Sequence, residues 1–216
     1  MILVDVKQGS PEWLEARRGV PTASNFHRII TAKSAKLSAQ ADDYACELLA
    51  ERYHLGPIDE LSGPATAAMR NGLATEPEAR RWYEFEHGFV SQVGFCLTDD
   101  GRFGCSPDGL VGDDGLLEIK RPTGKTHIRW LVDGGLPEEH KAQCHGALIV
   151  TGREWLDFWS TVPGLPPLLV RVVHDDFTLA LAECLEQFHE KLEDFWRLIG
   201  NPQVIHAPIS SVIPAK

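Results

Sequence analysis

A tight-turn signal in the middle of the chain places the strongest limit on its fold. The sequence Gly112-Asp113-Asp114-Gly115 separates two apolar, strand-like segments, Phe103 to Val111 and Leu116 to Lys120. This pattern predicts a β-hairpin, so the fold must contain a sheet in which these two strands are neighbours. Successive side chains on a strand point to opposite faces, so residues two apart share a face.

Three ionisable side chains meet on this hairpin if its register is right. Glu118 and Lys120 share one face, while Ile119 between them points into the core. A three-residue loop from Asp113 to Gly115, with its glycine left-handed, or an equivalent bulge, would pair Asp108 with Lys120 on that same face. A two-residue loop would place Asp108 opposite Ile119, on the wrong face. We therefore predict an odd-length loop.

Two carboxylates and a lysine in this arrangement suit metal-dependent cleavage of phosphodiesters. Carboxylates and a backbone carbonyl, here that of Ile119, are ligands for a hard cation such as Mg²⁺. The cation lowers the pKa of its bound water and neutralises charge that develops on the phosphate. A lysine beside that water can orient it, act as a base or stabilise the transition state. Asp108, Glu118 and Lys120 are thus candidate catalytic residues, although a Glu-x-Lys strand alone is more often a solvated face.

The composition excludes several other classes of function. The 216 residues are 43% hydrophobic and 24% charged, which suits one globular domain over 1–216 with a sizeable core. No run of about 18 apolar residues predicts a membrane span. The five scattered cysteines predict neither a disulfide framework nor a zinc site, and a cytoplasmic location fits best. The net charge of −10 argues against a passive DNA-binding protein, but it permits a nuclease whose positive charge lies in one cleft.

Capping residues and apolar periodicity predict several helices. The predicted helices span Glu12 to Arg18, Thr22 to about Ile30, a longer segment opened by Ser38, about Lys125 to Val132, Glu138 to Val150, and Thr178 to Ile199. Phe89 to Leu97, Trp155 to Val162 and Leu168 to Val173 have strand character. This order of helices and strands predicts a single mixed α/β domain with an irregular tail from about residue 201.

The stretch from Pro64 to His87 is helical in composition but contains two helix breakers, Gly72 and Pro77. Proline lacks a backbone N–H and is accepted only in the first turn of a helix. The sequence Thr75-Glu76-Pro77-Glu78 also matches a capping box. We therefore predict a break here and a new helix whose first turn contains Glu76.

Five ordered motifs resemble those of the lambda exonuclease family, also called YqaJ-like viral recombinases. They are Gln8-Gly9-Ser10-x-Glu12-Trp13-x-x-x-Arg17-x-Gly19-x-x-Thr22-Ala23-Ser24, Gly72-x-x-x-Glu76-x-x-Ala79-Arg80, Cys105-Ser106-Pro107-Asp108-Gly109-Leu110, Leu117-Glu118-Ile119-Lys120 and Ala142-Gln143-Cys144. The resemblance covers about residues 8 to 160. It implies a PD-(D/E)xK, restriction-endonuclease-like fold of the α/β class, in which a mixed sheet is flanked by helices. The family's strand-separating arginine is replaced by Ser34, with Lys33 beside it.

The resemblance also implies an activity, which is Mg²⁺-dependent 5′-to-3′ digestion of linear double-stranded DNA ends. Digestion leaves 3′ single-stranded overhangs for phage-type recombination, and Mn²⁺ is expected to substitute for Mg²⁺. The family's metal ligands match Glu76, Asp108, Glu118 and the carbonyl of Ile119. Its active-site lysine matches Lys120, and its buttressing glutamine matches Gln143. Its pocket for the 5′-phosphate matches Arg17, Ser24 and Ser106. Members often form ring-shaped homotrimers and work with a single-strand annealing protein, so both are expected here, inside a bacterial host cell.

Two other functions fit the same residues. An endonuclease of this fold would use the same carboxylates and lysine. It needs no pocket for a terminal phosphate, so the combination of Arg17 with Ser24 and Ser106 favours an end-directed enzyme. A non-catalytic DNA-binding recombination protein would keep the fold without the chemistry. The intact acidic residues and lysine, and the negative net charge, argue against that function.

Overall fold

A five-stranded mixed sheet forms the centre of the molecule, in the order β10-β9-β8-β7-β4. The computed structural model describes residues 1–55 and 65–200. For residues 65–75 it describes the backbone but not the side chains. The strands of this sheet are β4 (Val90–Ser91), β7 (Gly109–Val111), β8 (Gly115–Lys120), β9 (Trp155–Ser160) and β10 (Leu168–Val173). β8 and β9 run parallel, whereas the other neighbours are antiparallel.

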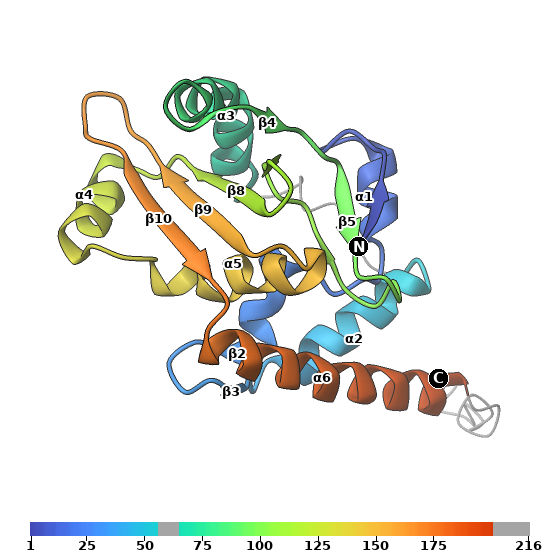
Figure 1. Cartoon of the computed structure of the whole chain (residues 1–216). Coiled ribbons are helices and arrows are strands. Elements are labelled where there is room, and N and C mark those ends of the chain that lie inside the picture. The colour runs from blue at the N-terminus through green and yellow to red at the C-terminus, as the bar shows by residue number, and fades with distance from the viewer. Residues whose placement is uncertain (56–64, 201–216) are drawn as a thin grey trace, which may run out of the picture.

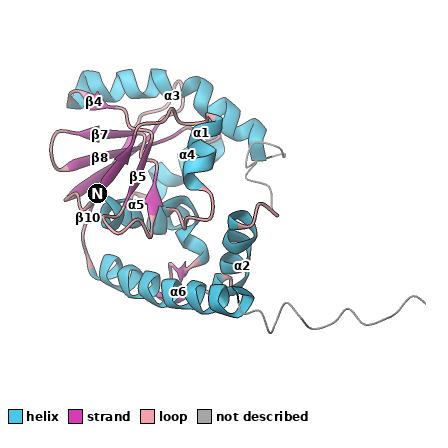
Figure 2. Cartoon of the chain, turned by 90° about the vertical axis from the view of Figure 1, so that its right-hand side faces the viewer, coloured by secondary structure: helices cyan, strands magenta, loops and turns pink. Residues whose placement is uncertain are grey.

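Helices cover both faces of this sheet (Figures 1 and 2). α3 (Ala65–His87) lies along one face. α5 (Glu138–Thr151) lies along the other face, and α6 (Asp176–Gly200) packs beyond it and against α2 (Ala41–Arg52). The parallel pair of strands requires a crossover, which α4 (Gly124–Asp133) and α5 provide. None of the described helices is long and apolar enough to cross a membrane.

Two clusters of buried side chains correspond to the two faces of the sheet. The smaller cluster lies beneath α3 and contains Ala79, Tyr83, Val90, Leu117, Ile119 and Trp159. The larger cluster lies on the α5 side and includes Leu116. This division follows from the alternation along β8, because Leu117 and Ile119 face α3 whereas Leu116 faces the other way. Glu118, two residues after Leu116, therefore points to the α5 side.

The remaining elements lie mainly in the N-terminal half of the chain. β1 (Ile2–Val4), β5 (Phe95–Leu97) and β6 (Gly104–Cys105) form a three-stranded sheet, and β2 (Ile30–Thr31) and β3 (Lys36–Leu37) form a separate ribbon. α1 (Pro11–Arg17) begins after Ser10, whose side chain accepts a hydrogen bond from the N–H of Trp13. Ser10 is thus the N-cap of this helix. The helices and strands predicted after Lys120 are all present, with ends that differ by at most a few residues.

The predicted helix break at Pro77 is wrong. α3 is continuous and Pro77 lies inside it, so Glu76 is in mid-helix. A proline in a helix interior costs about 3 kcal/mol. Packing of the next two turns offsets this cost, because Ala79 and Tyr83 are fully buried. In addition, the indole Nε1 of Trp159 donates to the carbonyl of Ala79 at 3.2 Å.

Two segments predicted as single strands are each divided between the two sheets. The segment 89–97 forms β4 and β5, and the segment 103–111 forms β6 and β7. The second division contains Pro107, which has no backbone N–H to contribute to a ladder. Residues 106–108 therefore form a loop that passes from one sheet to the other, and we call it the crossing loop.

Two predicted helix starts also differ from the structure. The residues after Thr22 form a short 3₁₀ helix, Ala23–Arg28, instead of an α-helix to Ile30. Thr22 forms a β-bridge with Gly104, which holds the start of this segment in an extended conformation. α2 begins at Ala41 rather than Ser38, because the β2–β3 ribbon, which was not predicted, extends to residue 37. The predicted irregular tail from about residue 201 lies outside the described residues.

Candidate active site

The loop of the β7–β8 hairpin has an odd number of residues, as predicted, but it is displaced along the sequence. Val111 pairs with Gly115, so the loop consists of residues 112–114 and not 113–115. The left-handed glycine is Gly112, with φ of 56°, and not Gly115 as predicted. The displacement shifts the register by two residues, which changes the cross-strand partners but keeps each side chain on its predicted face.

Asp108 lies across from Glu118, and not from Lys120 as predicted, when the observed register is extended beyond β7. The regular ladder has ended at this point, and the N–H of Asp108 donates to the carbonyl of Leu117 at 3.0 Å. The carboxylate turns back toward β8, where its Oδ2 accepts the N–H of Ile119 at 2.5 Å. Asp108 is therefore held beside the strand segment that carries Glu118 and Lys120.

Glu118, Lys120 and Gln143 form a hydrogen-bonded triangle on the α5 side of the sheet. The Nζ of Lys120 lies 2.7 Å from the Oε1 of Glu118. The Nε2 of Gln143 donates to the same oxygen at 2.6 Å, and the Oε1 of Gln143 accepts from Lys120 at 3.3 Å. Glu118 is only 4% exposed, so the interactions of its carboxylate are made largely out of water. Gln143, on α5, thus contacts both strand residues at once.

Glu76 approaches the site from the opposite helical layer. Its Oε1 accepts a hydrogen bond from the guanidinium of Arg80, one turn later on α3. Burial raises the pKa of Glu76, a shift that Arg80 opposes and the charge of Glu118 reinforces. Sequence reasoning assigned no role to Arg80. The four-residue spacing on a continuous helix is the signal that would have found this ion pair.

The site holds three acidic side chains, Glu76, Asp108 and Glu118, close to two cationic side chains, Arg80 and Lys120. Burial, followed by the charges of Glu118 and Glu76, raises the pKa of Asp108 well above its usual range. Burial alone would lower the pKa of Lys120, but the neighbouring carboxylates of Glu118 and Asp108 raise it above its usual value. Lys120 is therefore a cation at neutral pH. We call Glu76, Asp108, Glu118, Lys120 and Gln143 the carboxylate cluster.

The chemistry of this cluster fits a divalent cation with a preference for oxygen ligands. Asp108, Glu118 and Glu76 supply hard carboxylate oxygens, and a bound cation would relieve their mutual repulsion. In the part of the chain that the structure describes, no three acidic, histidine or cysteine side chains converge as a ready-made metal cage. Glu118 is instead paired with Lys120, and Glu76 with Arg80, so metal uptake requires these ion pairs to rearrange.

A second group of side chains, which we call the arginine cluster, contains Arg17, Ser24 and Ser106. The guanidinium of Arg17 donates to the hydroxyls of Ser24, Ser106 and Thr22, each at 3.4 Å. The Cζ of Arg17 lies 4.3 Å from the ring centroid of Trp13, whose Nε1 donates to Ser106 at 2.9 Å. The structure thus brings together all three predicted phosphate ligands. It adds Trp13 and Thr22, which belong to the first of the five motifs.

The crossing loop joins the two clusters. Ser106 belongs to the arginine cluster, and Asp108, two residues later, belongs to the carboxylate cluster. A cavity of about 560 Å³ opens beside this junction and is lined by Asp108, Glu76 and Arg80, among others. The arginine cluster and the carboxylate cluster are therefore joined by a single short loop.

Residues 12–154 match the sequence model of the YqaJ-like viral recombinase domain. The chain belongs to this family. The match spans about two thirds of the sequence, and it confirms the family that the five motifs indicated. A comparison with curated protein sequences gives no match.

Solved structures support the same relationship. LHK-Exo in complex with dAMP is 34% identical to this YqaJ-like protein, with a TM-score of 0.78, over 92% of this chain and 100% of that chain. A second structure, of the alkaline exonuclease LHK-Exo from Laribacter hongkongensis, is 32% identical, with a TM-score of 0.71, over 89% and 100% of the two chains. A phage-related exonuclease from Haemophilus somnus 129PT, 12% identical with a TM-score of 0.54 over 82% of this chain and 96% of that chain, is similar in fold alone. The predicted fold class, a mixed sheet flanked by helices of the PD-(D/E)xK type, is confirmed.

Proposed function

We propose that this YqaJ-like protein is a Mg²⁺-dependent exonuclease that digests linear double-stranded DNA from its 5′ ends. Digestion would leave 3′ single-stranded overhangs for phage-type recombination. Membership of the family and the likeness to the exonuclease LHK-Exo support a nuclease. The observation that carries the end-directed activity is the crossing loop, because an enzyme that starts at a terminal phosphate needs an anion-binding group next to its hydrolytic centre.

In this proposal Asp108, Glu118, Glu76 and the carbonyl of Ile119 hold Mg²⁺. The cation supplies an activated water and neutralises charge on the scissile phosphate. Lys120, kept protonated by its acidic neighbours, donates a hydrogen bond to a phosphate oxygen and stabilises the charge that develops in the transition state.

The other members of the two clusters orient these groups and bind the DNA end. Gln143 keeps Lys120 and Glu118 in place through its contacts with both. Arg17 binds the terminal 5′-phosphate, because its planar guanidinium can donate two parallel hydrogen bonds to phosphate oxygens. Ser24 and Ser106, whose hydroxyls already contact this guanidinium, complete the phosphate pocket.

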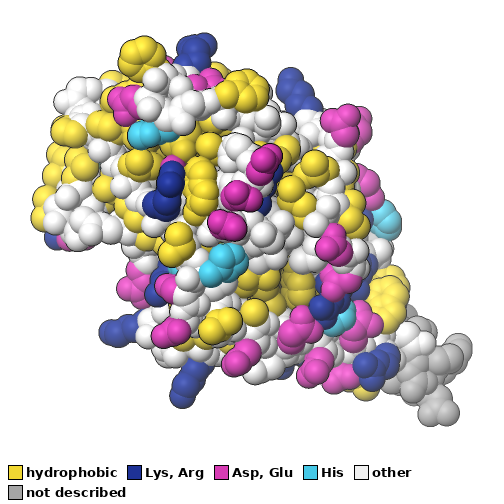
Figure 3. Space-filling model, viewed as in Figure 1, with side chains coloured by type: hydrophobic (Ala, Val, Ile, Leu, Met, Phe, Trp, Pro, Cys, Tyr) yellow, Lys and Arg dark blue, Asp and Glu magenta, His cyan; other side chains and the backbone are white. Residues whose placement is uncertain are grey.

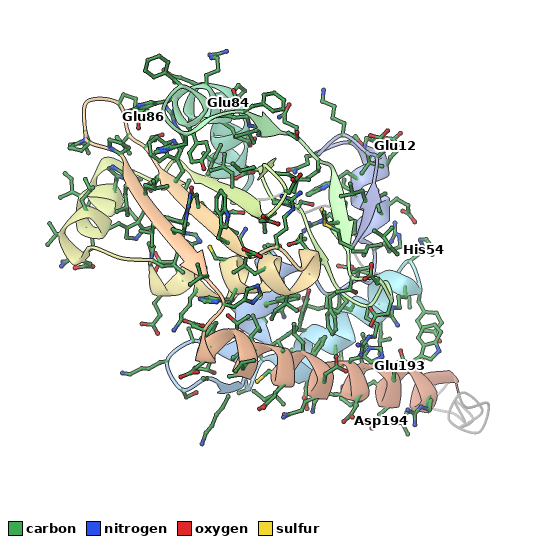
Figure 4. All side chains as sticks on the ribbon, viewed as in Figure 1. Glu12, His54, Glu84, Glu86, Glu193 and Asp194 are labelled. Atoms are coloured by element: carbon green, nitrogen blue, oxygen red, sulfur yellow. The ribbon has the colours of Figure 1, made fainter. Side chains whose placement is uncertain are left out.

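Part of the negative charge of the molecule lies on one helix, α6. Acidic side chains gather over α6 on the face shown in Figure 3. Asp194, which is exposed, projects from this helix in Figure 4 on the side away from α2. Such a surface repels the phosphate backbone, so the net charge of −10 and the activity on DNA are compatible.

Three DNA substrates test the proposal when each is incubated with the protein and Mg²⁺. Loss of 5′-phosphorylated linear duplex, with little loss of the dephosphorylated form and none of closed circles, is the expected result. Cutting of circles would indicate an endonuclease, and no loss of any substrate would indicate a non-catalytic binding protein. Release of label from the 5′ end before the 3′ end tests the direction of digestion.

The family resemblance further supports a homotrimer that works with a single-strand annealing protein. Analytical ultracentrifugation of the purified protein should give the mass of three chains. A mass of one chain would contradict the trimer but would leave the proposed reaction untouched.

A further inference from the structure

Gln8 connects two loops that are far from it in the sequence. Its Nε2 donates to the carbonyl of Val93 at 2.9 Å and to the carbonyl of Pro107 at 3.0 Å. Both N–H bonds of the amide are therefore used. Val93 lies between β4 and β5, and Pro107 is the central residue of the crossing loop. The amide of Gln8 thus holds the peptide group that leads directly into Asp108.

The backbone around Gln8 is itself in close contact with one of these loops. A Cβ atom added to Gly94 would lie 1.8 Å from the carbonyl oxygen of Val6, so the two backbones meet without room for a side chain. Gly9, with φ of 80°, then turns the chain toward α1, in a conformation that glycine adopts without strain. The segment that carries Gln8 is thereby held against the site.

α1 holds the crossing loop at a second point. The Nε1 of Trp13 and the guanidinium of Arg17 donate to the hydroxyl of Ser106 at 2.9 Å and 3.4 Å. The N-terminal segment 8–17 therefore contacts the loop at Ser106 through α1 and at Pro107 through Gln8. The next residue of the loop is Asp108.

The orientation of a ligand carboxylate controls how tightly a metal is bound. Side chains that hold metal ligands without touching the metal typically change metal affinity by about 10- to 100-fold when they are replaced. Asp108 is oriented from β8 by the N–H of Ile119. Gln8 constrains the backbone of Asp108, because it binds the carbonyl of the peptide group between Pro107 and Asp108.

We propose that Gln8 is a positioning residue for Asp108, whose backbone it fixes so that the carboxylate is presented for metal binding. The inference rests on the proposed function, in which Asp108 is a metal ligand. Its effect is on metal affinity rather than on recognition of the DNA end, because Gln8 donates to Pro107 and not to Arg17 or Ser106.

Replacement of Gln8 by an apolar side chain of similar length tests the proposal. Gln8→Leu removes both donors, and Gln8→Asn keeps the amide but shortens the side chain so that it cannot reach both carbonyls. Gln92→Leu is the matched control, because Gln92 is exposed and lines the same cavity as Gln8. By calorimetry without DNA, we expect Mg²⁺ to bind Gln8→Leu about 10- to 100-fold more weakly than the wild type. Gln92→Leu should bind as the wild type does.

Two further readouts separate positioning from a general loss of structure. Raising the Mg²⁺ concentration should restore kcat of Gln8→Leu, while KM for phosphorylated ends stays near the wild-type value. Hydrogen exchange of the Ile119 amide, measured without metal, should be faster in Gln8→Leu and unchanged in Gln92→Leu. Faster exchange throughout α5 would instead show a general loss of structure and overturn the assignment.

The outcomes distinguish this inference from the function on which it rests. If the wild type binds Mg²⁺ and Gln8→Leu binds it equally well, the role of Gln8 is refuted and the proposed nuclease activity stands. If the wild type takes up no Mg²⁺, the proposed function fails. The role of Gln8 in positioning Asp108 is then tested only by hydrogen exchange of the Ile119 amide. An exchange rate in Gln8→Leu equal to that of the wild type refutes this role.

Discussion

The carboxylate cluster and the arginine cluster lie at the two ends of one loop, but they are built in different ways. In the first, Lys120 and Gln143 bind a buried carboxylate oxygen at 2.7 Å and 2.6 Å. In the second, Arg17 contacts partly exposed hydroxyls at 3.4 Å. Charges that are shielded from water interact strongly, whereas exposed charges are screened by salt. From these contact lengths we infer that the carboxylate cluster is the more rigid of the two, and we propose that the looser arginine cluster binds an incoming anion.

Removal of the lysine from the rigid cluster should have the largest effect on activity. In Lys120→Ala we expect kcat to fall by about 10³-fold or more, because a preorganised cation in the transition state is lost. Steady-state digestion of phosphorylated linear duplex measures this loss. The exposed Lys36 provides a control, and Lys36→Ala should retain its activity. Full turnover in Lys120→Ala would remove this residue from the reaction and with it the contrast between the clusters.

Removal of the arginine from the looser cluster should have a smaller and more selective effect. In Arg17→Ala we expect kcat/KM on 5′-phosphorylated ends to fall by about 10- to 100-fold, the value of a charge-assisted hydrogen bond. The rate on 5′-hydroxyl ends should change little. The matched variant Arg197→Ala alters an exposed arginine at the end of α6. An equal loss on both kinds of end would show that Arg17 serves the fold or general DNA binding.

Ionic strength should separate the two clusters without any mutation. Raising the salt concentration from about 50 to about 200 mM screens exposed charges more than buried ones. The ratio of rates on phosphorylated and hydroxyl ends should therefore fall by a few fold, since the ratio cancels the salt dependence of general DNA binding. Mg²⁺ affinity of the free protein should change less. A constant ratio would mean that the charge of Arg17 is as well shielded as the buried carboxylate of Glu118.

The smallest expected effect is on stability, and it has the opposite sign from the effect on activity. Because the pKa of Asp108 is raised in the folded protein, ionisation of this group at neutral pH favours the unfolded state. Asp108→Asn removes the charge and keeps an oxygen for the N–H of Ile119. We expect its Tm in EDTA to exceed that of the wild type by a few degrees, and Mg²⁺ to raise only the wild-type value. A lower Tm of Asp108→Asn in EDTA would contradict the repulsion among the carboxylates.

The hairpin residues of the rigid cluster were more predictable from the sequence than Glu76 and Gln143, which the family resemblance supplied, or than the looser cluster. Alternation along one strand placed Glu118 and Lys120 on one face, and only the parity of the hairpin loop was needed to add Asp108. The register itself was wrong by two residues, because local turn preferences do not decide which glycine becomes left-handed. The arginine cluster draws residues from α1, the 3₁₀ helix and the crossing loop. Their proximity depends on tertiary structure, and the family resemblance supplied what spacing alone did not.

The same distinction holds for the fold. α6 was predictable because its apolar residues recur with the helical period. β9 and β10 were predictable because the prolines and glycine within residues 163–167 separate two apolar segments. The continuity of α3 through Pro77 was not, because the packing of Tyr83 and Trp159 against each other offsets a local penalty. The division of residues 103–111 between two sheets was also missed. An apolar run shows that a segment is buried, but it does not show where the chain leaves one sheet for another.

The hairpin loop at 112–114 places an unusual constraint on how this gene can vary. Asp113 and Asp114 are exposed, so many replacements at these positions should be neutral. Loss or gain of a single codon there would turn Asp108 to the opposite side of the sheet and inactivate the enzyme while leaving its core composition intact. A library of loop variants should therefore tolerate most residues at positions 113 and 114, where Gly112 is kept, yet accept changes in loop length only two codons at a time.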